Sequence, residues 1–139
     1  MIGVVKTIDA VATTTGSPAA AWRLLADPSA WTDWGAWSKV EVENGEEHGP
    51  GAVRVLVKTP YRLRELVTDW VPGERMGYEL LDGMRVEGYR ATVTLEAAEH
   101  GGAVIRWHST YDRAGLFTTL VLRLAVRDAC RRLAKAAAA

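Results

Sequence analysis

The sequence predicts an α+β fold in which a curved antiparallel sheet packs against one long C-terminal helix. Breaker residues at short intervals divide residues 37–113 into six segments, several of which alternate apolar and polar positions. Residues 116–138 contain no proline or glycine and end in alanines, which indicates a single helix. The expected order is a strand, two short helices, six strands and the long helix, and a length of 139 residues fits one domain over residues 1–139.

The first part of the chain combines a strand with two short helices. Residues 3–13 are rich in valine, isoleucine and threonine, which favours a strand. Ser17-Pro18 supplies an N-cap and a first helical residue, so we expect a helix that runs through Ala26. Asp27-Pro28 stops this helix and starts a second, which ends at about Trp34.

The middle of the chain is predicted to form an antiparallel meander. Val53, Val55 and Val57 alternate with other side chains, a period of two that is typical of a strand. Pairs such as Asp82-Gly83 and Gly101-Gly102 mark tight turns. The expected strands cover residues 37–44, 52–58, 61–71, 74–81, 85–97 and 102–113.

Charge, cysteine and histidine content exclude several function classes. The 17 basic side chains balance the 17 acidic ones, so no global positive field favours nucleic acid. Cys130 is the only cysteine, which excludes an internal disulfide and a multi-cysteine metal site. His108 falls on an outer face and His48 and His100 fall in predicted turns, so we expect no metal and no cofactor. No charged leader and no run of about 18 apolar residues occur, which predicts a cytoplasmic protein without an integral membrane segment.

Alternation assigns one face of each strand to the interior, where it packs against the long helix. In the segment 85–97, Val93 and Leu95 define this face, and the same parity includes Arg85, Glu87, Tyr89 and Ala91. The inward set expected on the other strands is Leu63, Glu65, Val67, Tyr78, Ala103, Ile105, Trp107, Ser109 and Tyr111.

Two carboxylates on a face that should be apolar indicate a cavity. Glu65 and Glu87 lie there among Tyr78, Tyr89 and Tyr111. A carboxylate in such a place needs an ion pair, a hydrogen bond or water, and a solid core would exclude it. The favoured interpretation is an amphipathic cavity that holds a mostly apolar ligand with a few polar contacts. The alternative is that a bulge turns one glutamate outward or that a nearby arginine pairs with it.

The long helix carries a second signal. A regular apolar stripe formed by Leu122, Val126, Cys130 and Leu133 should face the sheet. The N-terminal half is apolar nearly all round, so it should be covered on two sides, most simply by loops and short helices at the pocket mouth. The alternatives are an exposed patch for a dimer partner or for a lipid surface. The residues of this half are Leu116, Phe117, Leu120, Val121, Leu122 and Leu124.

Six tryptophans stand out beside a single phenylalanine. Trp31, Trp34 and Trp37 recur at a spacing of three residues, which predicts an aromatic wall at the mouth of the cavity. We expect at least one of these three to touch the ligand, and Trp22 to belong to the core.

Five motifs run through the chain: SPAAAW at 17–22, LLADP at 24–28, WTDW at 31–34, RELVTDWVPG at 64–73 and YRATVTL at 89–95. Together they resemble the START-like, or Bet v 1-like, helix-grip superfamily (SRPBCC), and within it the bacterial polyketide cyclase/dehydrase and lipid-transport group. The resemblance implies a helix-grip fold, with a seven-stranded curved antiparallel sheet around the C-terminal helix and a deep tunnel between them. Members bind sterols, phospholipids, polyketides, quinones or plant hormones, and many have no assigned catalysis.

The resemblance also concerns the site. In similar plant hormone receptors, a glutamate and a tyrosine line the pocket at positions that match Glu65 and Tyr89, the pair that the periodicity selects as well. The gate and latch motifs of those receptors have no clear counterpart in this chain. A hormone-receptor function is therefore not supported.

The leading hypothesis is a protein that binds a hydrophobic small molecule, such as a polyketide or a lipid, between the sheet and the long helix. The alternative is a polyketide cyclase or aromatase that catalyses an aldol condensation or dehydration, with Glu65 or Glu87 as the base and Tyr89 or another tyrosine as the donor to the enolate. A third hypothesis is a non-catalytic interaction module, a homodimer formed through the apolar start of the helix. The predicted ligand contacts are Trp31, Trp34, Trp37, Tyr78, Trp107, Tyr111, Leu122 and Val126.

Overall fold

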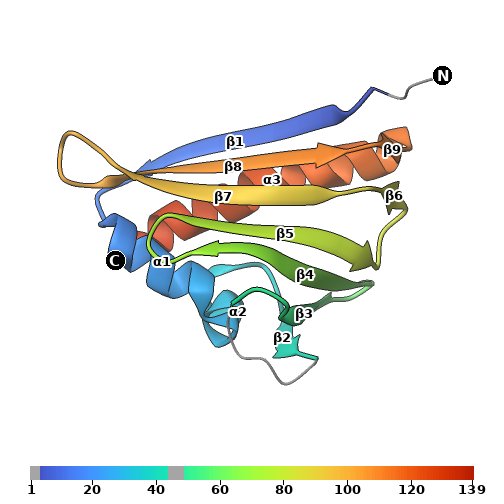
Figure 1. Cartoon of the computed structure of the whole chain (residues 1–139), viewed down its shortest axis with the longest axis horizontal. Coiled ribbons are helices and arrows are strands. Elements are labelled where there is room, and N and C mark those ends of the chain that lie inside the picture. Colours follow the sequence, from blue (N-terminus) through green and yellow to red (C-terminus); the bar gives the residue numbers. More distant parts are fainter. Residues whose placement is uncertain (1–3, 44–48) are drawn as a thin grey trace.

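The computed structural model of the chain describes residues 4–43 and 49–139. The predicted order of elements is confirmed, with two small strands added (Figure 1). The helical segments are α1 (Pro18–Ala26), the short 3-10 helix η1 (Pro28–Ala30), α2 (Trp31–Trp34) and α3 (Leu116–Ala137). The strands are β1 (Lys6–Thr14), β2 (Lys39–Val42), β3 (Val53–Lys58), β4 (Tyr61–Val71), β5 (Arg75–Asp82), β6 (Val86–Glu87), β7 (Arg90–Ala97), β8 (Ala103–Tyr111) and β9 (Arg113–Ala114).

Seven strands form one antiparallel sheet in the order β1-β8-β7-β5-β4-β3-β2. The first strand closes the sheet at one edge by pairing with β8, and β2 forms the opposite edge. Figure 1 shows α3 crossing one face of the sheet, with α1 and α2 gathered beside it at the lower strands. This is the helix-grip fold, as expected.

Local capping explains where the short helices begin. Ser17 Oγ accepts a hydrogen bond from the backbone N–H of Ala20 at 3.1 Å, and Pro18 occupies the first helical position of α1. Asp27 repeats the arrangement for η1, because its Oδ1 accepts from the N–H of Ser29 at 3.0 Å. The predicted helix starts therefore follow from side-chain chemistry that the sequence displays.

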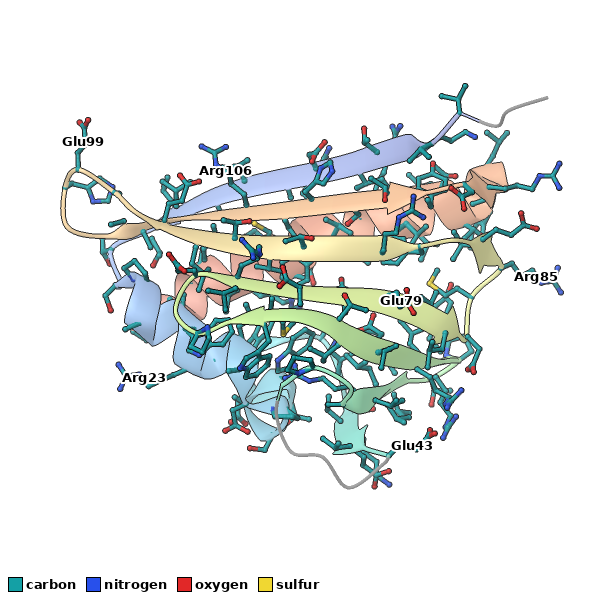
Figure 2. The ribbon with its side chains drawn as sticks, viewed as in Figure 1. Arg23, Glu43, Glu79, Arg85, Glu99 and Arg106 are labelled. Carbon is teal, nitrogen blue, oxygen red and sulfur yellow. The ribbon has the colours of Figure 1, made fainter. Side chains whose placement is uncertain are left out.

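The predicted segment 85–97 is broken at Gly88, whose φ is +68°. Because glycine tolerates this left-handed backbone, the chain turns there, and Glu87 pairs with Arg113 in a separate two-stranded ribbon of β6 and β9. The inward alternation begins only at Tyr89. The expectation that Arg85 and Glu87 face inward is therefore wrong: both are exposed, and Figure 2 shows Arg85 pointing away from the molecule.

The other strands keep the expected faces. Leu63, Glu65 and Val67 of β4 are buried, as is every second residue of β8 from Ala103 to Tyr111. His108 is exposed on the outer face, where its Nδ1 lies 2.5 Å from Asp9 Oδ1 of the paired strand β1. The turn predicted before Gly49, which includes His48, lies outside the described residues.

The N-terminal half of α3 is not roofed, contrary to expectation. Leu116, Phe117, Leu120 and Leu124 are exposed large apolar side chains, whereas Leu122 and the stripe after it are buried. Coverage depends on where α1 and α2 pack, and both leave this part of α3 open to solvent. No helix among the described residues is long and apolar enough to cross a membrane.

Candidate functional site

A cavity of about 220 Å³ lies between the sheet and α3. Its floor is formed by side chains of four strands, its roof by α3, and its wall by α2 and the segment after it. The predicted site residues that line it are Trp31, Trp34, Trp37, Glu65, Tyr78, Tyr89, Trp107, Leu122 and Val126.

Two predicted site residues lie elsewhere. Glu87 is exposed on β6, for the reason given above. Tyr111 is buried, but its hydroxyl lies 3.3 Å from Thr119 Oγ1 at the start of α3 and does not line the cavity. Tyr111 therefore ties the end of β8 to the long helix.

Several lining residues were not predicted. Met84 closes one side from the turn after β5, and Lys58 and Tyr61 reach the cavity from the hairpin between β3 and β4. Met84 lies in a turn, which carries no alternation signal. Tyr61 shares the parity of Leu63 and Glu65, and Lys58 shares that of Leu56, so alternation could have identified both. Ala129 also lines the cavity, and its position on the apolar stripe of α3 was the signal that could have identified it.

Glu65 is held on the inner face by strand pairing on both sides. It lies opposite Arg54 of β3 and Leu80 of β5. The pairing of β4 with β5 shifts register between Arg64 and Glu65 and again after Val67, so the bulges considered as an alternative exist. They nevertheless leave Glu65 only 7% exposed.

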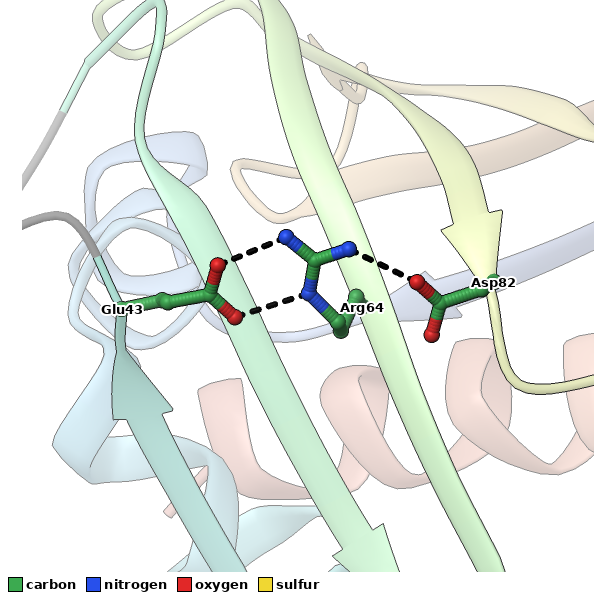
Figure 3. Close-up of polar contacts among 3 residues, drawn as sticks. All are labelled: Glu43, Arg64 and Asp82. Carbon is green, nitrogen blue, oxygen red and sulfur yellow. Dashed lines mark hydrogen bonds and ion pairs between the residues drawn. The ribbon is translucent and has the colours of Figure 1, made fainter.

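The neighbouring residue Arg64 anchors the outer face at this point (Figure 3). Its guanidinium donates to Glu43 beside β2 at 2.6 and 2.7 Å, and to Asp82 of β5 at 2.7 Å. These contacts tie β4 to its neighbour β5 and, across β3, to the end of β2. Because successive side chains of a strand point to opposite faces, holding Arg64 outward directs Glu65 toward the cavity.

The carboxyl group of Glu65 has an unusual environment. Burial raises its pKa from 4.5 to about 8, although the positive charge of Arg54 acts in the opposite direction. Within the described residues, no hydrogen bond reaches this carboxyl group. Glu65 is therefore mostly protonated at neutral pH and presents an O–H donor to the cavity.

Arg54, the residue opposite Glu65, is 2% exposed, and its guanidinium binds the end of α1 instead of Glu65. Its Nη1 and Nη2 donate to the carbonyls of Leu25 and Ala26 at 3.2 and 2.9 Å, at the end of α1. The guanidinium also lies 5.4 Å from the ring centre of Trp31. Burial lowers the pKa of Arg54 to about 10, so the group stays charged at neutral pH and is stabilised by the C-terminal end of the helix.

The tryptophans present carbon rather than N–H groups to the cavity. Trp31 Nε1 donates to the carbonyl of Leu25 at 2.9 Å, and Trp34 Nε1 donates to that of Leu24 at 3.1 Å. The two rings pack with centroids 4.8 Å apart. Because both indole N–H groups are satisfied by α1, Trp31 and Trp34 offer a ligand only apolar and aromatic surface.

Two phenol groups stand beside Glu65. Tyr78 Oη accepts from Trp107 Nε1 at 3.1 Å, and Tyr89 Oη lies 3.0 Å from Ser109 Oγ. The two phenols also interact with each other through a hydrogen bond. Burial raises the pKa of Tyr89 to about 12 and the pKa of Tyr78 well above its usual value. Both phenols are therefore protonated at neutral pH.

Residues 5–139 match the model of the family described as polyketide cyclase / dehydrase and lipid transport. The chain belongs to this family. The family description covers both enzymes and binding proteins, so membership supports a hydrophobic ligand and leaves open what happens to it. Among curated proteins, no sequence matches the chain.

Two solved structures show the same fold. The crystal structure of Ara h 8.0201 superposes with a TM-score of 0.79 at 16% identity, covering 96% of this chain and 98% of that one. A protein from Nitrosospira multiformis superposes with a TM-score of 0.80 at 13% identity, covering 94% of both chains. At these identities the likeness establishes the START-like, Bet v 1-like fold and nothing about the ligand.

Proposed function

We propose that the chain binds an uncharged, largely apolar small molecule that carries an oxygen acceptor, such as a ketone. The observation that supports this proposal is the Glu65 carboxyl, which is buried, faces the cavity and has no hydrogen-bond partner among the described residues. A hydrogen bond from the protonated carboxyl to a ligand oxygen would stabilise the complex by about 0.5–1.5 kcal/mol.

The shape and lining of the cavity support the same ligand class. At about 220 Å³ it exceeds the ~150 Å³ cavity that admits benzene, so one or two fused rings or a short chain would fit. Trp31, Trp34 and Leu122 supply apolar walls, while Glu65 offers a donor at the floor. Lys58 is the one basic side chain among the described lining residues, and it lies exposed at the end of β3, so the surroundings of Glu65 favour a neutral ligand.

The test compares a ketone with a hydrocarbon of the same shape. Intrinsic tryptophan fluorescence is titrated with 2-acetylnaphthalene and with 2-isopropylnaphthalene, and we expect the ketone to bind about tenfold more tightly. Glu65→Leu should abolish this preference, whereas Glu65→Gln, which keeps a donor, should retain it. Equal binding of both probes by the unchanged protein, or no quenching by either, would refute the proposal.

A cyclase or dehydratase is the second candidate, and the raised pKa of Glu65 is the observation that favours it. A carboxyl group with a pKa of about 8 exchanges protons near neutral pH, as a general acid or base must. In an intramolecular aldol reaction, ionised Glu65 would take a proton from the carbon between two carbonyls, and Tyr78 or Tyr89 would donate to the enolate oxygen. The family description supports this chemistry.

The catalytic candidate has its own test. A short poly-β-ketone thioester is incubated with the protein, and the products are compared with those of the spontaneous reaction. We expect Glu65→Gln to abolish any protein-dependent product, while Glu87→Gln, at an exposed glutamate outside the cavity, should leave the products unchanged. Identical products with and without the unchanged protein would exclude catalysis on this substrate and would not affect the binding proposal.

Two predictions from the sequence stay predictions: the homodimer through the start of α3 and the cytoplasmic location. The zero formal charge of the chain supports a small apolar partner over nucleic acid.

A further inference from the structure

The long helix exposes an apolar patch that the binding site does not use. It comprises Leu116, Phe117, Leu120 and Leu124 of α3, with Val11 of the adjacent edge strand β1; we call it the α3–β1 patch. Leu116 is 93% exposed and Phe117 is 73% exposed, which is far from the usual environment of such side chains. A contiguous exposed apolar surface marks a site of interaction.

The patch is continuous in space. Phe117, Leu120 and Leu124 follow one another at three and four residues along α3 and therefore share a helical face. Leu124 and Val11 line one shallow groove between α3 and β1. Figure 1 shows the beginning of α3 and the beginning of β1 at the same end of the molecule.

Basic side chains of α3 flank the patch, and Asp9, the acidic residue of β1 in the same groove, contacts His108. Arg123 and Arg127 are exposed and follow Leu120 and Leu124 by three residues, so they flank the leucines on the helix surface. Neither forms an ion pair with another described residue. Asp128, the one acidic residue of α3, is occupied by Arg131 and Arg132.

The helix as a whole carries five basic residues and one acidic residue, a net charge of +4 in a chain whose formal net charge is zero. A second copy of the chain, docked helix to helix, would bring two such positive surfaces together. An anionic lipid surface complements the same charges and accepts leucine and phenylalanine side chains between its headgroups. Charge therefore distinguishes the two partners.

We propose that the α3–β1 patch docks the protein on an anionic lipid surface, with Phe117, Leu120 and Leu124 inserted at the interface and Arg123 and Arg127 against the headgroups. Helix α3 would lie on the membrane and not cross it, in keeping with its length and composition. This docking is independent of whether the cavity binds a ligand.

Flotation of the full chain with vesicles tests the proposal. We expect the protein to float with vesicles of phosphatidylcholine and phosphatidylserine, to float much less with phosphatidylcholine alone, and to be released by salt. Phe117→Ser combined with Leu120→Ser should weaken binding at least tenfold, and each of Arg123→Gln and Arg127→Gln should weaken it about fivefold. The matched control is Leu81→Ser, an exposed leucine of β5 outside the patch, which should bind like the unchanged protein.

Three outcomes would overturn the proposal. The protein does not float with anionic vesicles, the double serine variant floats as well as the unchanged protein, or Leu81→Ser loses vesicle binding as much as the double variant. A concentration-dependent dimer in sedimentation velocity that the double serine variant abolishes, without vesicle binding, would assign the patch to a second copy instead. Circular dichroism checks the fold of each variant, and we expect all of them to be folded because the substituted side chains are exposed.

Discussion

Arg54 and Glu65 lie opposite each other on β3 and β4, both buried, yet they form no ion pair. Arg54 is bound to the carbonyls at the end of α1, and Glu65 faces the cavity. A carboxylate paired with this guanidinium would have a low pKa and no free capacity for a ligand. Burial keeps Glu65 protonated, and its separation from Arg54 leaves the carboxyl group available to a ligand.

The pH dependence of folding should reveal the buried carboxyl. The pKa of Glu65 is raised from 4.5 to about 8, so its neutral form stabilises the fold below pH 4.5, and that contribution is lost as pH rises through about 8. Between these limits the free energy of unfolding should fall by on the order of 5 kcal/mol. Urea denaturation across this range should show the decline, and Glu65→Gln should remove most of it. A parallel decline in both proteins would contradict the assignment.

Arg54 should be important for stability even though it is a charged residue in the interior. Arg54→Met would leave the carbonyl of Ala26 without this donor and remove the contact with Trp31, so we expect a loss of about 2 kcal/mol or more in the free energy of unfolding. Arg90→Met, at an exposed arginine on the outer face, is the matched control and should have little effect.

Arg54→Met should also change the pKa of Glu65. Because the charge of Arg54 lowers the pKa of Glu65, its removal should raise that pKa further. Carbon-13 NMR of the glutamate carboxyl groups would measure the change. An unchanged or lower titration midpoint would show that the two groups do not interact.

The alanine-rich end of the chain should be structural. A Cβ placed on Gly16 would lie 1.9 Å from the carbonyl oxygen of Ala137, so Gly16→Ala should push the end of α3 away and destabilise the fold by about 1–3 kcal/mol. Gly115→Ala, where no atom lies within 4 Å, should have a smaller effect. Thermal unfolding of the two variants compares them, and equal melting temperatures would show that the end of α3 does not pack as described.

The inward faces of most strands could be predicted from the sequence, because apolar and polar residues alternate along a half-buried strand. Alternation placed Glu65 and Tyr78 on the inner face, and the structure agrees. It failed at Glu87, because a glycine with positive φ resets the alternation; Gly88 inside a predicted strand was the available warning.

Other features depend on contacts between distant segments. Arg54 can be buried because carbonyls 28 and 29 residues away accept its N–H groups. No local sequence pattern predicts hydrogen bonds between segments this far apart. The exposure of Phe117 likewise depends on where α1 and α2 pack. Patterns along the chain predicted the elements and their faces, whereas the coverage of those faces required the assembled structure.

The titration of Glu65 with and without ligand tests the central claim most directly. With the glutamate carboxyl carbons labelled and Glu65→Gln used to assign the signal, we predict a midpoint near pH 8 in the free protein. Saturation with 2-acetylnaphthalene should move that midpoint higher, because the ligand accepts a hydrogen bond only from the protonated form. A midpoint near 4.5 in the free protein, or one that the bound ketone leaves unchanged, would contradict the account.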